Sequence, residues 1–258
     1  MTRHAWVAVT LGAFAAGCIS RDAGAQSLAQ RVDRAPDGRV RFSFKAKPGV
    51  CGFGENIHVS DRDDDEDVDF TQPPCLTGPV RVVLKISDRQ ITGIRTRVGG
   101  EWRPSTPEVT DLGMVAAPEA AKYLLSLAGR LEGGGEKAIF PATIADSAVV
   151  WPTLLSLARS SSVSRKTRHQ AIFWLGQAAE RAATRGLEDL AVSNSERGVQ
   201  EQAVFALSQR PKDEGIPVLI NIARTHHDPA IRKKALFWLG QSEDPRALAL
   251  FEELLSRR

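Results

Sequence analysis

Two cysteines are the residues in this sequence whose spacing most directly predicts a covalent bond. Cys51 and Cys75 form an even pair once Cys18, near the N-terminus, is set aside. An even pair in an oxidising compartment favours a disulfide. A zinc site is the alternative, but neither cysteine belongs to a Cys-x-x-Cys unit and only His58 lies nearby. We therefore predict a disulfide between Cys51 and Cys75.

An acidic run between these cysteines is the second group that could do chemistry. Asp61, Asp63 and Asp65 alternate along the chain, and alternating carboxylates can supply the oxygen ligands that Ca²⁺ takes. The run lacks the sixth-position glycine and the terminal glutamate of a calcium-binding loop. A solvated acidic loop is the simpler interpretation. We predict no metal site, with these three aspartates as weak candidates and a calcium-stabilised cell-envelope module as an alternative function.

Familiar catalytic motifs are missing from the sequence. It contains no Gly-x-Ser-x-Gly, no His-Glu-x-x-His and no phosphate-binding loop. His226 and His227 are adjacent and would point in different directions, and His169 lies on a polar face. We therefore predict a protein that is not an enzyme, with no catalytic residue and no cofactor.

An internal repeat dominates the C-terminal half. AIFWLGQ at 171–177 returns as AVFALSQ at 203–209 and as ALFWLGQ at 235–241, with a spacing of 32 residues each time. Such a period is typical of a solenoid, in which one helical hairpin cannot cover its own apolar face and must stack on its neighbours. The matched apolar positions predict a core ladder of Phe173, Leu175, Phe205, Leu207, Phe237 and Leu239.

The apolar periodicity also predicts where the helices lie. One helix should begin near Pro118. The later ones are expected over 164–178, 182–193, 196–209, 214–225, 229–241 and 245–257. Together they predict an α-solenoid over 117–258.

The unit at 227–240 resembles a HEAT repeat of the short type found in phycobilin-lyase-like HEAT proteins. That pattern has an Asp that opens the first helix, an Arg four residues later, then Ala and Leu-Gly. The matching residues are Asp228, Arg232, Ala235, Leu239 and Gly240. The resemblance extends over about 117–258 and implies an array that serves as a scaffold or adaptor, and in some members as a lyase.

Residues 39–111 are predicted to form a small β-rich domain. Apolar and polar residues alternate over 40–44 and again over 80–98, which indicates half-buried strands and a hairpin. Residues 26–38 are polar and are expected to be a linker. Residues 101–116 contain two prolines and suggest a second linker or a last irregular strand. The predicted fold class is therefore α+β and multidomain, a β-rich domain followed by a solenoid.

The N-terminus predicts export. Residues 1–25 have a short basic start and an apolar run from Ala5 to Ile19, which is short for a membrane span. Small residues before Gln26 predict cleavage after Ala25, whereas a lipoprotein anchored at Cys18 and a retained anchor are the alternatives. No other segment is apolar and long enough to cross a membrane, so we expect a periplasmic or secreted protein.

The sequence predicts a protein or peptide partner rather than nucleic acid. Its net charge of +3 comes from 34 basic and 31 acidic residues, which is too balanced to indicate a nucleic-acid surface. Candidate contact residues are the recurring glutamines and the basic residues near the starts of two first helices. They are Gln177, Gln209, Gln241, Arg168, Arg232 and Lys233.

Structural roles compete with these contacts, since glutamines can cap helix ends or bridge adjacent repeats, and Arg232 can reach back toward the start of its helix or toward a neighbouring repeat. The favoured function is an exported, non-enzymatic scaffold of unknown oligomeric state. A HEAT-type lyase-like enzyme or ligand-binding protein is the other alternative.

Overall fold

The computed structural model describes residues 26–53, 56–59 and 75–256. Two predictions fall on other residues and lie outside the described part of the chain. They are the signal peptide over 1–25 and the weak metal candidates Asp61, Asp63 and Asp65.

A four-stranded sheet forms the first half of the structure. It contains β1 (Gly38–Phe44), β5 (Val80–Ser87), β6 (Gln90–Val98) and β7 (Val109–Met114), in the order β6-β5-β1-β7. β5 and β6 form the predicted antiparallel hairpin, and β1 pairs antiparallel with β5. β7 pairs parallel with β1, so the segment before the helices is a strand rather than a linker. The alternation places one face of the sheet in the core, with Val40, Phe42, Phe44, Val80, Val82 and Leu84 fully buried.

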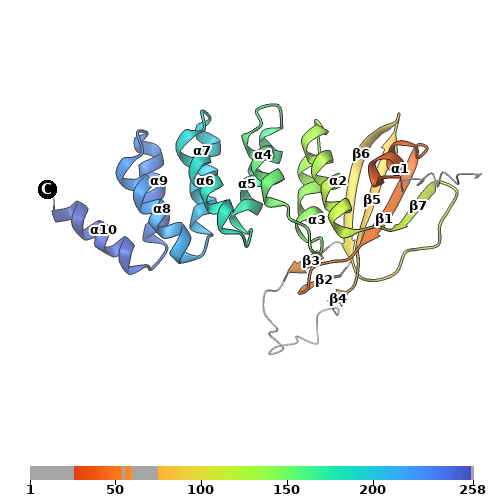
Figure 1. The fold of residues 1–258 in the computed structure, drawn as a ribbon, viewed down its shortest axis with the longest axis horizontal. Coiled ribbons are helices and arrows are strands. Elements are labelled where there is room, and N and C mark those ends of the chain that lie inside the picture. Colours follow the sequence, from red (N-terminus) through yellow and green to blue (C-terminus); the bar gives the residue numbers. More distant parts are fainter. Residues whose placement is uncertain (1–25, 54–55, 60–74, 257–258) are drawn as a thin grey trace, which may run out of the picture.

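A three-stranded sheet lies beside one end of the larger one (Figure 1). Its strands are β2 (Val50–Phe53), β3 (Asn56–Val59) and β4 (Leu76–Thr77), in the order β3-β2-β4. The predicted disulfide is present, because Cys51 of β2 is bonded to Cys75, the residue before β4. Because β4 is only two residues long, this bond supplements a very short ladder.

Helices in two layers make up the rest of the molecule. After α2 (Ala117–Arg130), a short 3₁₀ turn η1 (Gly135–Ala138) leads into α3 (Ile139–Thr143). The remaining helices are α4 (Trp151–Arg159), α5 (Arg165–Gly176), α6 (Arg181–Ser193), α7 (Arg197–Ser208), α8 (Lys212–Thr225), α9 (Pro229–Gly240) and α10 (Pro245–Ser256). Contacts join α3, α5, α7 and α9 into one layer and the even-numbered helices into the other. The predicted array of helical hairpins is therefore confirmed, with helix ends close to those expected from the repeat.

The prediction of a linker over 26–38 is wrong. Residues Leu28–Asp33 form the helix α1, which begins with a capping box between Ser27 and Gln30. Leu28 and Val32, one helical turn apart, are buried. The N–H of Leu28 also donates to Glu119 Oε1 of α2 at 2.6 Å. Two apolar residues on one face are enough to dock this short helix because α2 supplies the surface.

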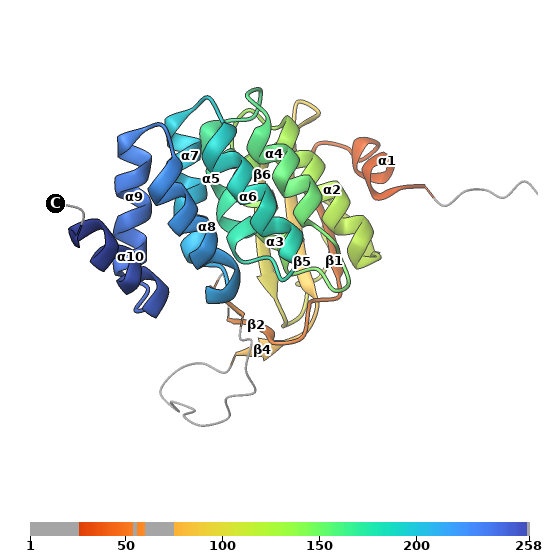
Figure 2. The same ribbon diagram turned by 60° about the vertical axis from the view of Figure 1, so that its left-hand side comes forward.

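The sheet and the solenoid share one continuous core. Phe42 of β1 packs edge-on against Tyr123 of α2, with ring centroids 6.4 Å apart. Beyond β1, the chain forms an antiparallel bridge between Ala46 and Ala145, and the N–H of Lys47 donates to Ile144 O at 2.9 Å. Figure 1 shows the two helical layers leading away from one face of the sheet, and Figure 2 shows α1 beside α2. The sheet thus covers the first end of the array.

The predicted core ladder is half right. Leu175, Leu207 and Leu239 are buried, as are the spacer alanines Ala171, Ala203 and Ala235. The phenylalanines are not: Phe173 and Phe205 are partly exposed and Phe237 is 54% exposed. Each Phe precedes the buried Leu by two residues, which places it about 200° away around the helix. The phenylalanines therefore lie on the opposite side of their helices.

The turn between β5 and β6 depends on one carboxylate. Asp88 and Arg89 both have positive φ, at 53° and 59°, which is costly for residues with a side chain. Asp37 accepts hydrogen bonds from both of their N–H groups, at 2.8 and 3.0 Å. We expect Asp37→Ala to lower the free energy of unfolding by about 1 kcal/mol, measured by urea denaturation. The matched control is Asp33→Ala, an exposed aspartate outside the turn, and an equal loss there would contradict this role.

Candidate functional site

A row of aromatic rings follows the layer formed by α3, α5, α7 and α9. Trp174 of α5 stacks on Phe140 of α3, the preceding helix in this layer, with ring centroids 5.2 Å apart. The ring of Trp238 lies 5.0 Å from that of Phe205 of α7, and the two ring planes are tilted by 51°. None of these rings is fully buried. We call this set the aromatic row: Phe140, Phe173, Trp174, Phe205, Phe237 and Trp238.

The aromatic row lacks a tryptophan at α7. The position that holds Trp174 and Trp238 is Ala206 in α7. A Cβ added to Gly176 would lie 3.2 Å from the Ala206 Cβ and 3.0 Å from its carbonyl oxygen, so these two helices pack closely through small residues. Phe173 therefore lacks the covering ring that Phe205 receives from the following helix, and it presents apolar surface in the middle of the array.

The three recurring glutamines lie at the ends of these helices. Gln177, Gln209 and Gln241 are the C-cap residues of α5, α7 and α9, and their side chains are exposed. Each follows a phenylalanine by four residues, which places it one turn further along the same side of the helix. An amide side chain both donates and accepts hydrogen bonds. The result is three Phe–Gln pairs repeated across the array, namely Phe173–Gln177, Phe205–Gln209 and Phe237–Gln241.

Two of the basic contact candidates are engaged within the protein. The guanidinium of Arg168, 9% exposed, binds both carboxylate oxygens of Glu196 at 2.5 and 2.8 Å. The Nη1 of Arg232 donates to the carbonyl oxygens of His226 at 2.7 Å and His227 at 3.1 Å. Both arginines therefore join a first helix to a neighbouring turn or repeat. Lys233 of α9 is exposed and is the basic candidate that stays accessible.

Other ion pairs also join neighbouring repeats. Arg197 at the start of α7 reaches Asp228 at 2.8 Å, and the Asp228 carboxylate also accepts the N–H of Ala230 at 2.8 Å. Asp228 is thus the N-cap of α9, as expected, and the N–H of Ala230 lowers its pKa, with Arg197 contributing in the same direction against the opposing effect of burial. Similar bridges span the other layer, and they join Arg159 to Asp189, Arg181 to Asp213 and Arg224 to Glu253.

Arg210 is the most buried of these charged links. Its side chain is 1% exposed and donates to Thr184 Oγ1 at 2.9 Å, to Glu180 O at 3.2 Å and to Ala178 O. Its charge is balanced by Glu214, whose carboxylate lies 2.8 Å away. Thr184 and Arg210 together lower the pKa of Glu214. This arginine, supplied by the following repeat, holds the turn that connects α5 and α6.

The described residues offer no assembled metal centre. Among them, no group of three or more His, Cys, Asp or Glu side chains could hold a metal ion. The Nδ1 of His226 accepts the N–H of Asp228 at 3.0 Å, and its ring stacks on His227 with centroids 4.4 Å apart. His226 is therefore buried at the end of α8 while His227 is exposed, and their stacked rings differ from the expectation that the two side chains point in different directions.

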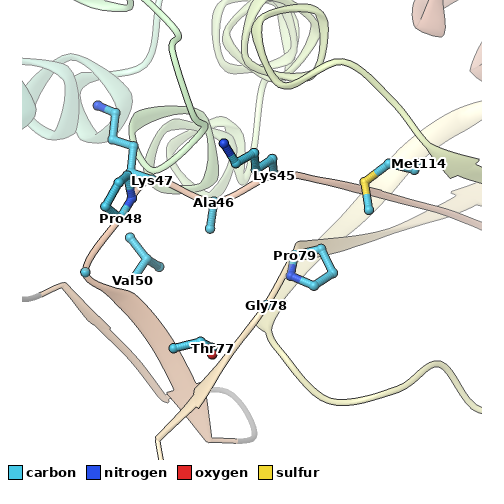
Figure 3. A pocket seen from close by; sticks show the side chains of 10 residues that line it. Lys45, Ala46, Lys47, Pro48, Val50, Thr77, Gly78, Pro79 and Met114 are labelled. Carbon is cyan, nitrogen blue, oxygen red and sulfur yellow. The ribbon is translucent and has the colours of Figure 1, made fainter.

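A shallow hollow lies between the end of β1 and the small sheet (Figure 3). Its lining includes Val50, Thr77, Pro79 and Met114. The ammonium groups of the two lysines at its rim point away from Val50 and Thr77, and the one on Lys45 pairs with Asp146 at 2.8 Å. The hollow therefore offers mainly small apolar surface, and we assign it no chemistry.

Comparison with known proteins identifies the last part of the helical array. Residues 184–258 match the family model described as HEAT repeats. No curated protein matches the chain. The C-terminal half thus carries HEAT repeats, as the resemblance at 227–240 predicted, while the N-terminal region is not assigned to a family. Such repeats generally act as protein-interaction scaffolds.

Removal of the buried guanidinium tests the link between repeats. We expect Arg210→Ala to lower the free energy of unfolding by about 3 kcal/mol, because it removes the nearest counter-ion of the Glu214 carboxylate, which then keeps only the exposed Arg181 at 3.5 Å. Arg159→Ala is the matched control, since Arg159 is 50% exposed and joins neighbouring repeats through Asp189. The control should cost less than about 1 kcal/mol. Urea denaturation measures both, and similar losses would show that Arg210 has no special role.

A second test concerns the last hairpin. The Arg246 guanidinium lowers the pKa of Asp244 from its ordinary 3.8 to about 2, against the opposing effect of burial. A carboxylate with a lowered pKa in the folded state stabilises the fold above its unfolded pKa, and this contribution is lost as the pH falls through the folded value. Asp244→Asn should therefore be less stable than the wild type near neutral pH, with the difference shrinking between about pH 4 and pH 2. Denaturation at a series of pH values measures it, and a difference that stays constant would contradict the assignment.

Proposed function

We propose that this protein is an exported, non-enzymatic scaffold that binds an extended segment of a partner protein across α5, α7 and α9. The observation that carries this proposal is the threefold repetition of an exposed glutamine one turn beyond a partly or largely exposed phenylalanine. Packing and capping account for the buried Leu and Ala of each repeat. They leave the outward Phe–Gln pairs unexplained.

The spacing of the pairs suits an extended chain. Packed helices lie about 8–10 Å apart. An extended polypeptide advances about 3.3 Å per residue. A segment that crosses the helices therefore meets a new Phe–Gln pair roughly every third residue. At each step the amide can exchange hydrogen bonds with the backbone of the segment, while Phe packs against its side chains.

The remaining chemistry of the described residues supports a binding role rather than catalysis. The charged side chains with the lowest exposure are engaged in ion pairs between or within repeats, as at Arg168, Arg210 and Asp244. Cys51 and Cys75 are bonded to each other, so neither supplies the thiol that a conjugating enzyme would need. Lys233 and the three glutamines are left for contact.

The disulfide supports the proposed location. Bonds of this kind persist in oxidising compartments, outside the cytosol of most cells. Among the residues that the structure describes, none of the helices has both the length and the apolarity to cross a bilayer. We add to these observations the apolar N-terminal run and the cleavage pattern before Gln26, and propose export after cleavage at Ala25.

Selection from a displayed library of unstructured peptides would test the binding face. Peptides that bind the purified chain should lose at least tenfold in affinity, by fluorescence anisotropy, for the triple variant Gln177→Ala, Gln209→Ala and Gln241→Ala. Phe237→Ser, at a ring that is 54% exposed, should weaken binding with little change in melting temperature. Arg185→Ala, on an exposed position of α6, is the control that should leave affinity unchanged. Equal binding of the peptides to the wild type and to all three variants would contradict the proposal.

A further inference from the structure

The face of the four-stranded sheet that points away from the core is strongly basic. Strand alternation and register place the basic side chains on this side, opposite the buried residues of the same strands. They are Arg39 and Arg41 of β1, Arg81 and Lys85 of β5, and Arg95 and Arg97 of β6. Among the described residues of these four strands, the carboxylate that lies on this face belongs to Asp111 of β7. It is already bound by Arg41 at 2.7 Å.

The register sets like charges directly against each other. Arg39 of β1 lies directly opposite Lys85 of β5. Like charges that face each other across neighbouring strands destabilise a sheet. Arg39, Lys85 and Arg95 are all exposed, so their charge is presented to solvent. The free protein therefore carries a repulsion on this face that a bound anion would relieve.

The connection from β6 to β7 supplies an aromatic ring and the acidic residues Glu101 and Glu108 beside this face. The ring of Trp102 lies 5.1 Å from the guanidinium carbon of Arg41 and 5.2 Å from that of Arg81. The Nε and Nη1 of Arg81 are buried with no hydrogen-bond partner among the described residues, while its Nη2 donates to Gly100 O. Burial lowers the pKa of Arg81, and the charge of Arg41 acts in the same direction against Glu101. The guanidinium groups of Arg41 and Arg81 thus lie against the same aromatic ring, below the exposed basic side chains.

We propose that this basic face binds a linear anionic polysaccharide that carries carboxylate or sulfate groups. Neighbouring strands are about 4.8 Å apart, close to the length of one sugar residue in a polymer. Arg39 and Lys85 face each other across β1 and β5, whereas Arg95 of β6 faces Val83 and lies diagonally from Lys85. A chain that crosses the strands obliquely can therefore place anionic groups over all three side chains. Guanidinium and ammonium groups bind such anions through charge-assisted hydrogen bonds.

Other polyanionic partners fit the face less well. A folded protein partner needs large apolar anchors, whereas Val83, at the centre of these basic side chains, is partly buried and the exposed Met114 lies at the β7 edge of the sheet. Insertion into a membrane also needs exposed apolar side chains at the contact. Stacking of nucleic-acid bases needs a free aromatic face, whereas Trp102 is engaged by two arginines. The disulfide further indicates a compartment in which extracellular polysaccharides are at hand.

Binding of labelled polygalacturonate and dextran sulfate to the purified full chain tests the proposal, with neutral dextran as the negative control. Both anionic polymers should bind, and their affinity should fall steeply between about 50 and 200 mM NaCl. The double variant Arg39→Gln and Lys85→Gln should bind about tenfold more weakly. Its melting temperature should stay the same or rise, because the substitution removes a like-charge pair. A purely structural role for these residues would instead lower the melting temperature.

A matched control distinguishes loss of charge on the basic face from loss of net charge elsewhere on the protein. Lys122→Gln with Arg185→Gln removes the same charge at exposed positions of α2 and α6 and should change affinity less than twofold. An equal loss in this control, or no binding of either polymer, would overturn the proposal. So would tighter binding of single-stranded DNA, of polyglutamate or of vesicles that contain anionic lipid, if the Arg39 and Lys85 substitutions weakened it. The glutamine variants of the repeats should bind the polymers normally, so this result stands apart from the peptide-binding test.

Discussion

Burial of the apolar side of one helical hairpin against the next is the interaction on which the rest of this structure depends. Each hairpin has apolar side chains, such as Ala203 and Leu207, that would be exposed to solvent if no neighbouring element covered them. At the start of the array the neighbour is the four-stranded sheet, which packs Phe42 against Tyr123 and bridges Ala46 to Ala145. The β-rich part is therefore the cap of the solenoid as well as a fold of its own. At α9 and α10, by contrast, apolar residues remain exposed, namely Phe237, Leu248, Leu254 and Leu255.

Charged residues then fix how the hairpins are set against each other. Hydrophobic stacking is non-directional, so it does not by itself choose one rotation between neighbouring repeats. The paired arginines and carboxylates, from Arg168 with Glu196 to Arg197 with Asp228, supply that direction. The same residue types that suggest a contact surface in the sequence are thereby used inside the array. What remains outward is a repeated aromatic ring and a repeated amide.

The extent to which this fold can be predicted follows the range of the interactions involved. Helix spans and the disulfide could be inferred because periodicity and cysteine parity are properties of the sequence itself. The helix α1 could not, since six residues with two apolar side chains carry little periodicity until α2 covers them. The outward position of Phe205 was available in principle, because Phe and Leu two residues apart cannot share one helical face. The basic face needs the strand register, since Arg39 meets Lys85 only once β1 is paired with β5.

The two proposed surfaces lie on different parts of one continuous core, and this placement has a mechanical consequence. Most residues that link the sheet to α2 and α3 are buried or hydrogen-bonded across the seam, so the basic face and the Phe–Gln pairs are held in a fixed relation. A chain with a flexible linker between them would gain only effective concentration from binding two ligands. A rigid seam also fixes distance and orientation. A partner segment held on α5, α7 and α9 would then be presented at a set position relative to a polymer on the sheet, which is the geometry expected of an adaptor between an anionic matrix and a protein.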